Sequence, residues 1–451
     1  MGWATVVLAA GRGSRMRSAL PKPLHTVAGR PMLALVVEAV RAAGCEHIVV
    51  VAAREDDDVA AAARALGTRV APQGEPQGTG HATLAARDAC AGARHVLVVN
   101  ADLPLIRPET LRALAAAHAE GDVAVTFLTA HLADPAGYGR VLREDGVLRI
   151  VEERDIGELR AALRTALREV NVGVYAAEAS WLWPALEAIP PAASGERYLT
   201  EIVAAAAAER AGTRTVSAAD AGEVRQVNTR VELAQAEAVL RARVRERLML
   251  GGVTMLDPAS TFVDATVTVG ADTTLLPGVH LLGETHVGGG CRIGPGAVLR
   301  DTAVGDRCEI GGSTIEGATL ADDVSVGPYC HVRPGSVIEA GVHLGNYAEV
   351  KASRIGARTQ VGHFSYIGDA ELGPDVNIGA GTVTCNFDGT AKHRTIIGAG
   401  AFIGSDSMLV APVRIGAGAR TAAGAVVTAD VPDGALAVGV PARIRREREG
   451  V

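Results

Sequence analysis

An aliphatic residue returns at nearly every sixth position through most of the second half of this 451-residue chain. The series runs through Val287, Ile293, Leu299, Val304, Ile310, Ile315, Leu320, Val326, Val332, Ile338, Leu344, Val350, Ile355, Val361, Ile367, Leu372 and Ile378, and resumes from Ile397 to Val427. No helical period matches a spacing of six, and an ordinary antiparallel strand alternates at every second residue. A six-residue period is typical of a parallel β-helix, in which each short strand stacks on its equivalent one coil away.

The repeat is interrupted once, between Cys385 and Arg394, where the expected aliphatic residue is missing. Because the repeat then resumes, we expect this segment to leave the coil as a loop and to lie at a site of chemistry. The coils are expected to begin near Thr254 and to continue to about Val440, which gives about nine or ten coils. Aromatic residues are only 3% of the chain, which suits narrow coils filled by Val, Ile and Leu.

The first half alternates short aliphatic runs with segments of helical spacing. The expected strands are Thr5–Leu8, His47–Val51 and His95–Val99, and the expected helices are Pro31–Ala43, Asp57–Leu66, Gly80–Ala89 and Pro108–Ala119. This alternation predicts a mostly parallel sheet with helices on both faces. Ligands of such sheets bind at the carboxyl ends of the strands, so the loops after Leu8, Val51 and Val99 are the candidates for a site.

A run of helix-forming residues separates the two halves. Thr229–Leu250 contains neither Gly nor Pro and is followed by Gly251 and Gly252, so we expect one long helix here. The predicted domains are therefore a nucleotide-binding α/β domain over residues 1–228, a linker helix over 229–250 and a β-helix over 251–451.

Composition narrows the classes of function. A net charge of −7 without a basic run argues against a nucleic-acid partner. The six cysteines form no Cys-x-x-Cys pair, so they predict free thiols in a reducing compartment and neither a zinc site nor a redox motif. The chain starts with a short strand in place of a charged leader, and no apolar run approaches the ~20 residues that span a bilayer. We expect a soluble cytoplasmic protein.

The loop after the first strand is rich in glycine and arginine. Gly11 and Gly13 would let backbone amides approach phosphate oxygens, and Arg12 and Arg15 add positive charge. A plain glycine turn between a strand and a helix is an equally good interpretation of Gly-x-Gly alone. Lys22, held between two prolines, favours the phosphate site because a stiff segment can aim its ammonium group, although a solvated surface lysine is the alternative.

The run Leu8-Ala-Ala-Gly-x-Gly-x-Arg-Met16, followed by Pro21-Lys22, resembles the nucleotidyltransferases that join a sugar 1-phosphate to a nucleoside triphosphate. The resemblance implies UTP as substrate, with Lys22 and Arg15 neutralising phosphate charge, Gln73 and the Gly78–Thr79 backbone at the uracil, and Mg²⁺ on Asp102 and Asn228. Gly139, Glu152 and Asn171 would hold an N-acetylhexosamine. The implied nucleotide-sugar contacts are Leu8, Ala9, Ala10, Gly11, Lys22, Gln73, Gly78, Thr79, Asn100, Ala101, Asp102, Gly139, Glu152, Asn171 and Asn228. Singly, each of Glu152, Asn171 and Asn228 is more often a surface or capping residue than a ligand.

The β-helix half carries polar residues that a structural stalk would not need. His363 directly follows the repeat residues Val361 and Gly362, although a lone histidine is usually structural. Arg333, Lys351 and Asp369 lie eighteen residues apart, one coil each, and should share one edge of the prism. Two cations on one edge repel each other unless an anion lies between them, and a sugar phosphate would suit.

The second half resembles hexapeptide-repeat acyltransferases. From Thr5 to about Val440 the chain is similar to the bacterial bifunctional N-acetylglucosamine-1-phosphate uridyltransferases / glucosamine-1-phosphate acetyltransferases, which supply a cell-wall precursor. The resemblance implies acetyl-CoA as co-substrate, His363 as general base, and a homotrimer whose site lies between subunits and is closed by the Cys385–Arg394 loop with Asn386 and Lys392. The implied acceptor residues are Arg333, Lys351, Tyr366 and Asn377, and the implied acetyl-CoA residues are Ala380, Asn386, Phe387, Ser405 and Ala423.

The match departs from the family pattern in three places. Asn100 and Ala101 replace an aromatic residue and a glycine before Asp102, and Phe387 replaces a common tyrosine. The family's C-terminal arginine on coenzyme A has no counterpart, so Arg443, Arg445 or Arg446 would have to substitute. Two alternatives stay open: a sugar-nucleotide pyrophosphorylase whose β-helix only trimerises or binds an effector, and a non-enzymatic β-helix protein.

Overall fold

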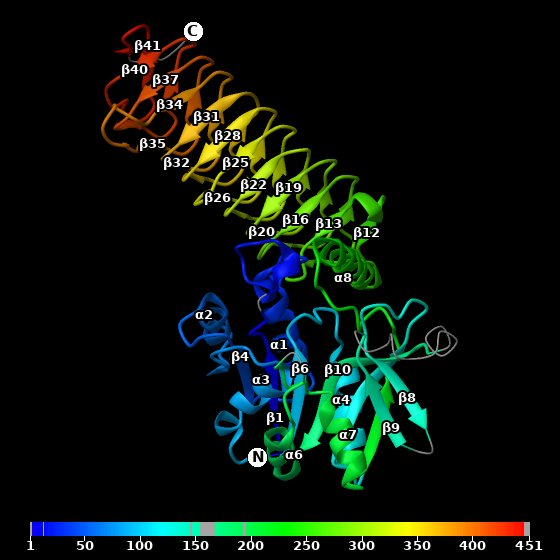
Figure 1. The fold of residues 1–451 in the computed structure, drawn as a ribbon. Helices are drawn as coiled ribbons and strands as arrows, with labels where there is room; N and C mark the ends of the chain where they lie inside the picture. The colour runs from blue at the N-terminus through cyan, green and yellow to red at the C-terminus, as the bar shows by residue number, and fades with distance from the viewer. Residues whose placement is uncertain (1, 12, 145–146, 154–166, 193–194, 446–451) are drawn as a thin grey trace. The chain divides into compact units, whose positions relative to one another are not determined.

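The computed structural model describes residues 2–11, 13–144, 147–153, 167–192 and 195–445; Arg12 and Arg446, named above, lie outside them. The chain divides into two compact units, Met1–Leu240 and Arg241–Val451 (Figure 1). The first is an α/β unit and the second is a left-handed parallel β-helix, so the predicted fold class is confirmed.

A nine-stranded sheet forms the centre of the first unit, with the order β11-β7-β10-β6-β1-β4-β5 and the hairpin β8–β9 beside β10. The strands are β1 (Trp3–Leu8), β4 (Ile48–Ala52), β5 (Arg69–Pro72), β6 (His95–Asn100), β7 (Val125–His131), β8 (Arg140–Glu144), β9 (Val147–Val151), β10 (Glu169–Glu178) and β11 (Thr213–Ser217). β1 is parallel to β4 and β6, as predicted, whereas β10 is antiparallel to β6 and β7. The short strands β2 (Thr26–Val27) and β3 (Arg30–Pro31) pair with each other.

Two hydrophobic cores form because alternate residues of each strand face opposite sides of the sheet. Val7 and Val50 belong to the core under α1, α2 and α4, whereas Val6 and Val49 belong to the core under α3, α6 and α7. The helices are α1 (Met32–Ala42), α2 (Asp58–Ala65), α3 (Thr79–Ala85), α4 (Pro108–Ala119), α6 (Ala179–Ala188) and α7 (Glu201–Ala208). Both faces of the sheet are therefore covered.

The long helix α8 (Arg230–Leu250) begins with a capping box and contains the boundary between the two units. The Oε2 atom of Glu232 accepts hydrogen bonds from the amides of Asn228 (2.8 Å) and Thr229 (2.7 Å), and the Glu232 amide donates to Thr229 Oγ1. Ala236 packs in the first unit, and Val244 in the core of the β-helix. The cap also fixes the backbone of Asn228, a predicted metal ligand.

The β-helix consists of three sheets whose neighbouring strands are parallel, apart from the antiparallel pair β41–β42. The first sheet comprises β12 (Thr254–Met255), β15 (Thr274–Leu275), β18 (Arg292–Ile293), β21 (Glu309–Ile310), β24 (Ser325–Val326), β27 (His343–Leu344), β30 (Gln360–Val361), β33 (Asn377–Ile378), β36 (Phe402–Ile403), β39 (Arg420–Thr421), β41 (Leu436–Val438) and β42 (Arg443–Arg445). The second comprises β13 (Phe262–Val263), β16 (His280–Leu282), β19 (Val298–Arg300), β22 (Thr314–Glu316), β25 (His331–Val332), β28 (Ala348–Lys351), β31 (Ser365–Gly368), β34 (Val383–Cys385), β37 (Met408–Val410) and β40 (Val426–Val427). The third comprises β14 (Thr268–Val269), β17 (His286–Val287), β20 (Ala303–Val304), β23 (Thr319–Leu320), β26 (Val337–Ile338), β29 (Arg354–Ile355), β32 (Ala370–Leu372), β35 (Thr395–Ile397) and β38 (Val413–Ile415).

The aliphatic residues of the hexapeptide series all lie in one continuous buried core inside the prism. Each series member packs on its equivalents in the coils before and after, for example Val332 on Ile315 and Val350. Burial of these side chains is the main source of stability for coils with such short strands. The hexapeptide period is therefore confirmed as the period of the core.

The predicted loop leaves the coil between β34 and β35 (Figure 1). Phe387 and Lys392 form an antiparallel bridge across it. Asp388 accepts hydrogen bonds from the amides of Ala391 and Thr390 and from His393, which together hold the pKa of its carboxyl well below the usual range. The loop is thus braced by its own polar contacts.

All six cysteines are free thiols, and five of them are buried. Among the described residues, no helix combines the length and the apolar character that a membrane span requires.

An aromatic cluster around the buried His118 lies in the first unit. His118 packs edge-on to His95 with ring centroids 5.3 Å apart and contacts Trp3, and burial lowers the pKa of His118 to about 4. The neighbouring charges act in opposite directions, since Glu178 raises this pKa while His95 and Arg214 lower it.

We expect acidification to destabilise this unit. Between pH 6.5 and pH 4 the unfolded chain binds a proton at His118 that the folded chain does not, so the free energy of unfolding falls by up to about 3 kcal/mol across this window. The first unit contains all three tryptophans, Trp3, Trp181 and Trp183. A urea titration followed by tryptophan fluorescence therefore measures the free energy of unfolding of this unit. In His118→Asn the free energy of unfolding should change less steeply with pH. An unchanged slope would show that His118 is not the group responsible.

Candidate active sites

The cleft of the first unit lies at the carboxyl ends of β1 and β6, where the sequence placed it. Its volume is about 810 Å³, and it is lined by Leu8, Ala9, Ala10, Gly11, Gly13, Ser14, Arg15, Lys22, Pro23, Gln73, Glu75, Pro76, Gly78, Thr79, Ala82, Asn100, Ala101, Asp102, Glu196, Tyr198, Gln226 and Asn228. The nucleotide residues predicted from the motif are therefore brought together in one cavity.

Lys22 lies at the centre of the polar end of this cleft. Its ammonium group donates to Asp102 Oδ2 at 2.7 Å and to Asn228 Oδ1 at 3.0 Å, and Arg15 donates to the same Asn228 oxygen at 3.0 Å. Gly13 permits this packing because it has a φ of +58° and a Cβ there would lie 2.6 Å from Lys22 Cβ. The surface alternative for Lys22 is wrong, since its side chain is mostly buried.

Asp102 and Asn228 present two oxygens that suit a hard divalent cation. Asp102 Oδ1 is buried and has no hydrogen-bond partner among the described residues, while Asn228 Oδ1 faces the two cationic side chains. Among those same residues no group of three or more His, Cys, Asp or Glu side chains forms a metal cage. A carboxylate and an amide oxygen fit Mg²⁺, which commonly takes one or two protein ligands and completes its shell with phosphate oxygens and waters.

A second cavity of about 190 Å³ adjoins the first and contains the predicted sugar-binding residues Gly139, Glu152 and Asn171. Thr200 Oγ1 donates to Glu152 Oε1 at 2.7 Å, and Asn171 Nδ2 donates to the hydroxyl of Tyr175 at 2.7 Å. Carboxylate, amide and hydroxyl groups gathered in a small cavity are able to recognise a polyhydroxylated ring.

Asn100 lines both cavities, and its Nδ2 atom donates to the Gly173 carbonyl at 3.3 Å. Gln73, which also lines the larger cavity, is buried and donates to the Gly78 carbonyl at 3.1 Å. Gly78 has a φ of +93°, and a Cβ there would lie 2.4 Å from the Arg197 carbonyl oxygen. This close approach brings the segment that contains Tyr198 and Thr200 against α3.

Sequence reasoning missed Tyr198, Thr200 and Gln226, which line these cavities. Residues 197–200 reach the site through backbone contacts with Gln77 and Gly80 and through the bond from the Leu199 amide to Thr79 Oγ1. A contact between segments 120 positions apart leaves no local pattern in the chain.

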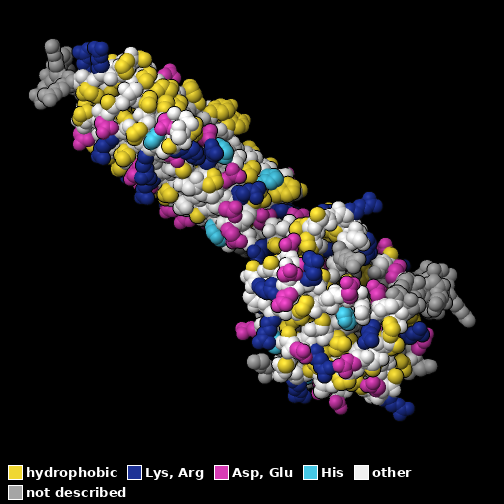
Figure 2. Space-filling view, turned by 60° about the vertical axis from the view of Figure 1, so that its left-hand side comes forward, with side chains coloured by type: hydrophobic (Ala, Val, Ile, Leu, Met, Phe, Trp, Pro, Cys, Tyr) yellow, Lys and Arg dark blue, Asp and Glu magenta, His cyan; other side chains and the backbone are white. Residues whose placement is uncertain are grey.

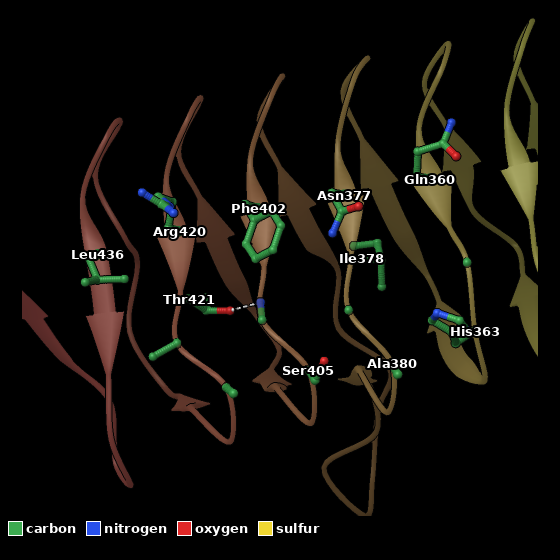
Figure 3. Close-up of a pocket in the computed structure, with 15 residues that line it drawn as sticks. Gln360, His363, Asn377, Ile378, Ala380, Phe402, Ser405, Arg420, Thr421 and Leu436 are labelled. Atoms are coloured by element: carbon green, nitrogen blue, oxygen red, sulfur yellow. Dashed lines mark hydrogen bonds between the residues drawn. The ribbon is translucent and has the colours of Figure 1, made fainter.

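The second site is a cleft of about 720 Å³ along the C-terminal coils of the β-helix. It is lined by Gln360, Gly362, His363, Asn377, Ile378, Gly379, Ala380, Phe402, Gly404, Ser405, Arg420, Thr421, Ala422, Ala423 and Leu436. Figure 3 shows Gln360, Asn377, Phe402, Arg420 and Leu436 on successive strands, with His363, Ala380 and Ser405 in the turns that follow. The structure thus brings His363 and Asn377 together with three of the predicted acetyl-CoA residues.

The other predicted residues gather on the neighbouring face. Lys351 Nζ lies 3.2 Å from Asp369 Oδ2, which also accepts from Asn386 Nδ2 at 2.5 Å, and Asn386 contacts the Tyr366 hydroxyl at 3.4 Å. Arg333 pairs with Glu349 at 2.9 Å. Each of the two stacked cations thus pairs with a carboxylate of the protein.

Lys392, from the loop, adds a further cation. Arg333, Lys351 and Lys392, together with their neighbours Tyr366, Asp369 and Asn386, are called the cationic group below. The ammonium group of Lys351 lowers the pKa of Lys392, and Arg333 adds to the effect. Since three cations face two carboxylates here, the surface retains an affinity for an anionic ligand. Asn386 belongs to this cationic group, and neither it nor the exposed Phe387 is among the cleft-lining residues described above.

His363 lies in the turn that joins β30 to β31 and lines the cleft. Its side chain is exposed, and no described residue forms a hydrogen bond with its imidazole. One chain therefore presents an acid–base group at a long cleft. Arg443 and Arg445, the two described candidates for the missing arginine, are exposed on β42 and do not line the cleft, whereas Arg420 does.

Known proteins match both halves of the chain. Residues 5–216 match the family model of the MobA-like NTP transferase domain, and residues 394–429 match that of bacterial transferase hexapeptide repeats. The bifunctional protein GlmU of Pelobacter propionicus is 44% identical over 450 residues, covering 98% of this chain and 97% of its own. The GlmU proteins of Trichlorobacter lovleyi (46% over 441 residues; 96% and 95%) and Heliobacterium modesticaldum (44% over 439 residues; 96% and 94%) are similar to it over nearly the same length.

Proposed function

Because the chain belongs to the family of bifunctional GlmU proteins, we propose that its two sites perform successive transfers with the residues assigned below. The β-helix transfers an acetyl group to glucosamine 1-phosphate, and the α/β unit transfers a uridylyl group from UTP to N-acetylglucosamine 1-phosphate with release of pyrophosphate. The observation that carries the assignment is the pair of cavities: one has Lys22 between Asp102 and Asn228, the other has His363 at its edge.

In uridylyl transfer a phosphate oxygen of the sugar attacks the α-phosphorus of UTP, and the bond from that phosphorus to the pyrophosphate oxygen breaks. Such a transfer needs positioning and neutralisation of charge more than covalent help from the protein. Lys22 and Arg15 supply positive charge at the phosphates. Gln73 and the Gly78–Thr79 backbone hold the base, and Gly139, Glu152 and Asn171 hold the sugar.

Mg²⁺ is the proposed metal of this site, held by Asp102 and Asn228. When bound, it supplies charge neutralisation on the phosphates. The Lys22 ammonium group contacts both of these oxygens, which places its charge beside the proposed metal site.

In acetyl transfer the amine of glucosamine 1-phosphate attacks the thioester carbon of acetyl-CoA, and the coenzyme A thiol leaves. His363 accepts the proton that the amine loses, because its imidazole is exposed and lines the cleft. Arg333, Lys351 and Tyr366 bind the sugar phosphate, with Asn377 beside His363. Ala380, Ser405 and Ala423 line the path of acetyl-CoA.

Association of the β-helix into a trimer is part of this proposal. Figure 2 shows apolar side chains exposed over much of the β-helix. Tyr329, Tyr347, Phe364, Phe387 and Phe402 are each at least 46% exposed. Exposed apolar surface of this extent favours contact with another protein surface, and a neighbouring copy would turn the open cleft into an enclosed pocket.

Omission of single components tests the two reactions. We expect free thiol only when glucosamine 1-phosphate and acetyl-CoA are both present, and pyrophosphate only when N-acetylglucosamine 1-phosphate, or the components that make it, UTP and Mg²⁺ are present. EDTA should stop release of pyrophosphate and leave release of thiol unchanged. Thiol release that needs Mg²⁺, or no thiol release at all, would contradict the assignment and favour a pyrophosphorylase with a structural β-helix.

A further inference from the structure

Phe402 and Arg420 lie on adjacent strands of the first β-helix sheet, at the end of the cleft away from His363 (Figure 3). The guanidinium carbon of Arg420 lies 6.0 Å from the centre of the Phe402 ring, and 46% of the Phe402 surface is exposed. Among the described lining residues, Arg420 is the only lysine or arginine. An exposed aromatic face beside a guanidinium group is a common platform for a nucleotide, which offers a base to stack and phosphates to pair.

The position of this pair along the prism matches an extended acyl donor. The strand order β30-β33-β36-β39 places Arg420 three strands beyond the strand that precedes His363. At roughly 4.8 Å a strand, Arg420 lies about 14 Å along the prism from the strand that precedes His363. Besides Asn377, Ile378 and Thr421, the lining of this stretch includes six small residues, namely Gly379, Ala380, Gly404, Ser405, Ala422 and Ala423.

The small residues of this stretch leave room for a long, unbranched arm. Acetyl-CoA has this form: a thioester at one end, a pantetheine arm, and a phosphorylated adenine nucleotide at the other end. With the thioester at His363, the nucleotide reaches the Phe402–Arg420 end.

We propose that Arg420 binds the phosphates of the coenzyme A nucleotide in this chain, with Phe402 supporting its guanidinium group. The proposal rests on the acetyltransferase function stated above. In this proposal Arg420 takes the role of the missing C-terminal arginine. Leu436, the last residue that lines the cleft, pairs with Arg420 on one side and with Arg445 on the other. Arg420 therefore lines the cleft, whereas Arg445 lies just beyond it on an exposed strand.

The test compares Arg420→Ala with the wild-type protein, with Arg292→Ala as matched control. Arg292 is exposed on the same sheet, on β18, outside the cleft. In Arg420→Ala we expect the KM for acetyl-CoA and the calorimetric Kd for coenzyme A each to rise about tenfold, the scale of a lost hydrogen bond to a charged group. The kcat and the KM for glucosamine 1-phosphate should stay unchanged, and Arg292→Ala should behave as wild type.

A truncated donor separates phosphate binding from a structural role. S-acetylpantetheine lacks the nucleotide, so wild-type protein and Arg420→Ala should use it equally well. The proposal is overturned if Arg420→Ala impairs S-acetylpantetheine as strongly as acetyl-CoA, or if Arg445→Ala raises the Kd for coenzyme A while Arg420→Ala does not. Failure of the proposed function itself would look different: wild-type protein would release no thiol from either donor, while the Kd comparison would still decide the role of Arg420.

Discussion

His363→Ala should lower the kcat of acetyl transfer by about 10²- to 10⁴-fold, while uridylyl transfer should keep its wild-type rate. The expected loss is large because, among the described residues that line this cleft, only His363 carries a group suited to accept a proton from the amine. Release of free thiol from acetyl-CoA measures the first activity, and release of pyrophosphate from UTP, with N-acetylglucosamine 1-phosphate supplied, measures the second.

His343→Ala is the matched control for this variant. His343 lies on the same β-helix sheet, one strand before β30, where its ring contacts the Ser325 hydroxyl at 2.7 Å and does not line the cleft. Both activities should survive in His343→Ala. Loss of both activities in His363→Ala would contradict two independent sites, and retention of acetyl transfer would remove His363 from the mechanism.

Lys22→Ala should lower uridylyl transfer roughly 100-fold, the cost of removing one donor to charge that develops in the transition state. The substitution removes the ammonium group that bridges Asp102 and Asn228 and leaves both oxygens without that partner. Acetyl transfer should be unchanged. Initial rates of pyrophosphate release at saturating UTP measure the effect on kcat.

Lys22→Arg distinguishes charge from shape at this position. A guanidinium group keeps the charge but is planar and wider than an ammonium group, so it should restore only part of the rate. Arg17→Ala, an exposed change close to the same loop, serves as control and should be silent. An unchanged rate in Lys22→Ala would rule out its assignment to the phosphates.

The fold could be predicted from the sequence because its main signal is periodic. Residues such as Val332 and Val350 recur at the spacing of the coil, so every repeat marks the same position as buried in the core. The strands β1, β4 and β6 were likewise visible as aliphatic runs. The antiparallel direction of β10 was not, because strand direction depends on which partner pairs with Glu169–Glu178 and not on the composition of that segment.

The site was predictable where residues lie in compact motifs and not where distant segments meet. Lys22 and Asp102 belong to short motifs, and they lie 2.7 Å apart. Tyr198 comes from a segment with no motif, held in place by backbone contacts to α3. Asn386 is predicted among the acetyl-CoA residues; nothing in the sequence indicates that within one chain its side chain donates to Asp369, because the two residues are 17 positions apart and belong to no common motif.

The location of the primary amines has a practical consequence for labelling. The sequence contains only three lysines, Lys22, Lys351 and Lys392, although it has 44 basic residues in total. One lies in the nucleotide cleft and two in the cationic group. Amine-directed reagents therefore find their side-chain targets only in the two candidate sites, with the α-amino group as the remaining target. Protection by UTP would report on one lysine and protection by glucosamine 1-phosphate on the other two, so a single mass spectrum could follow the occupancy of each site separately.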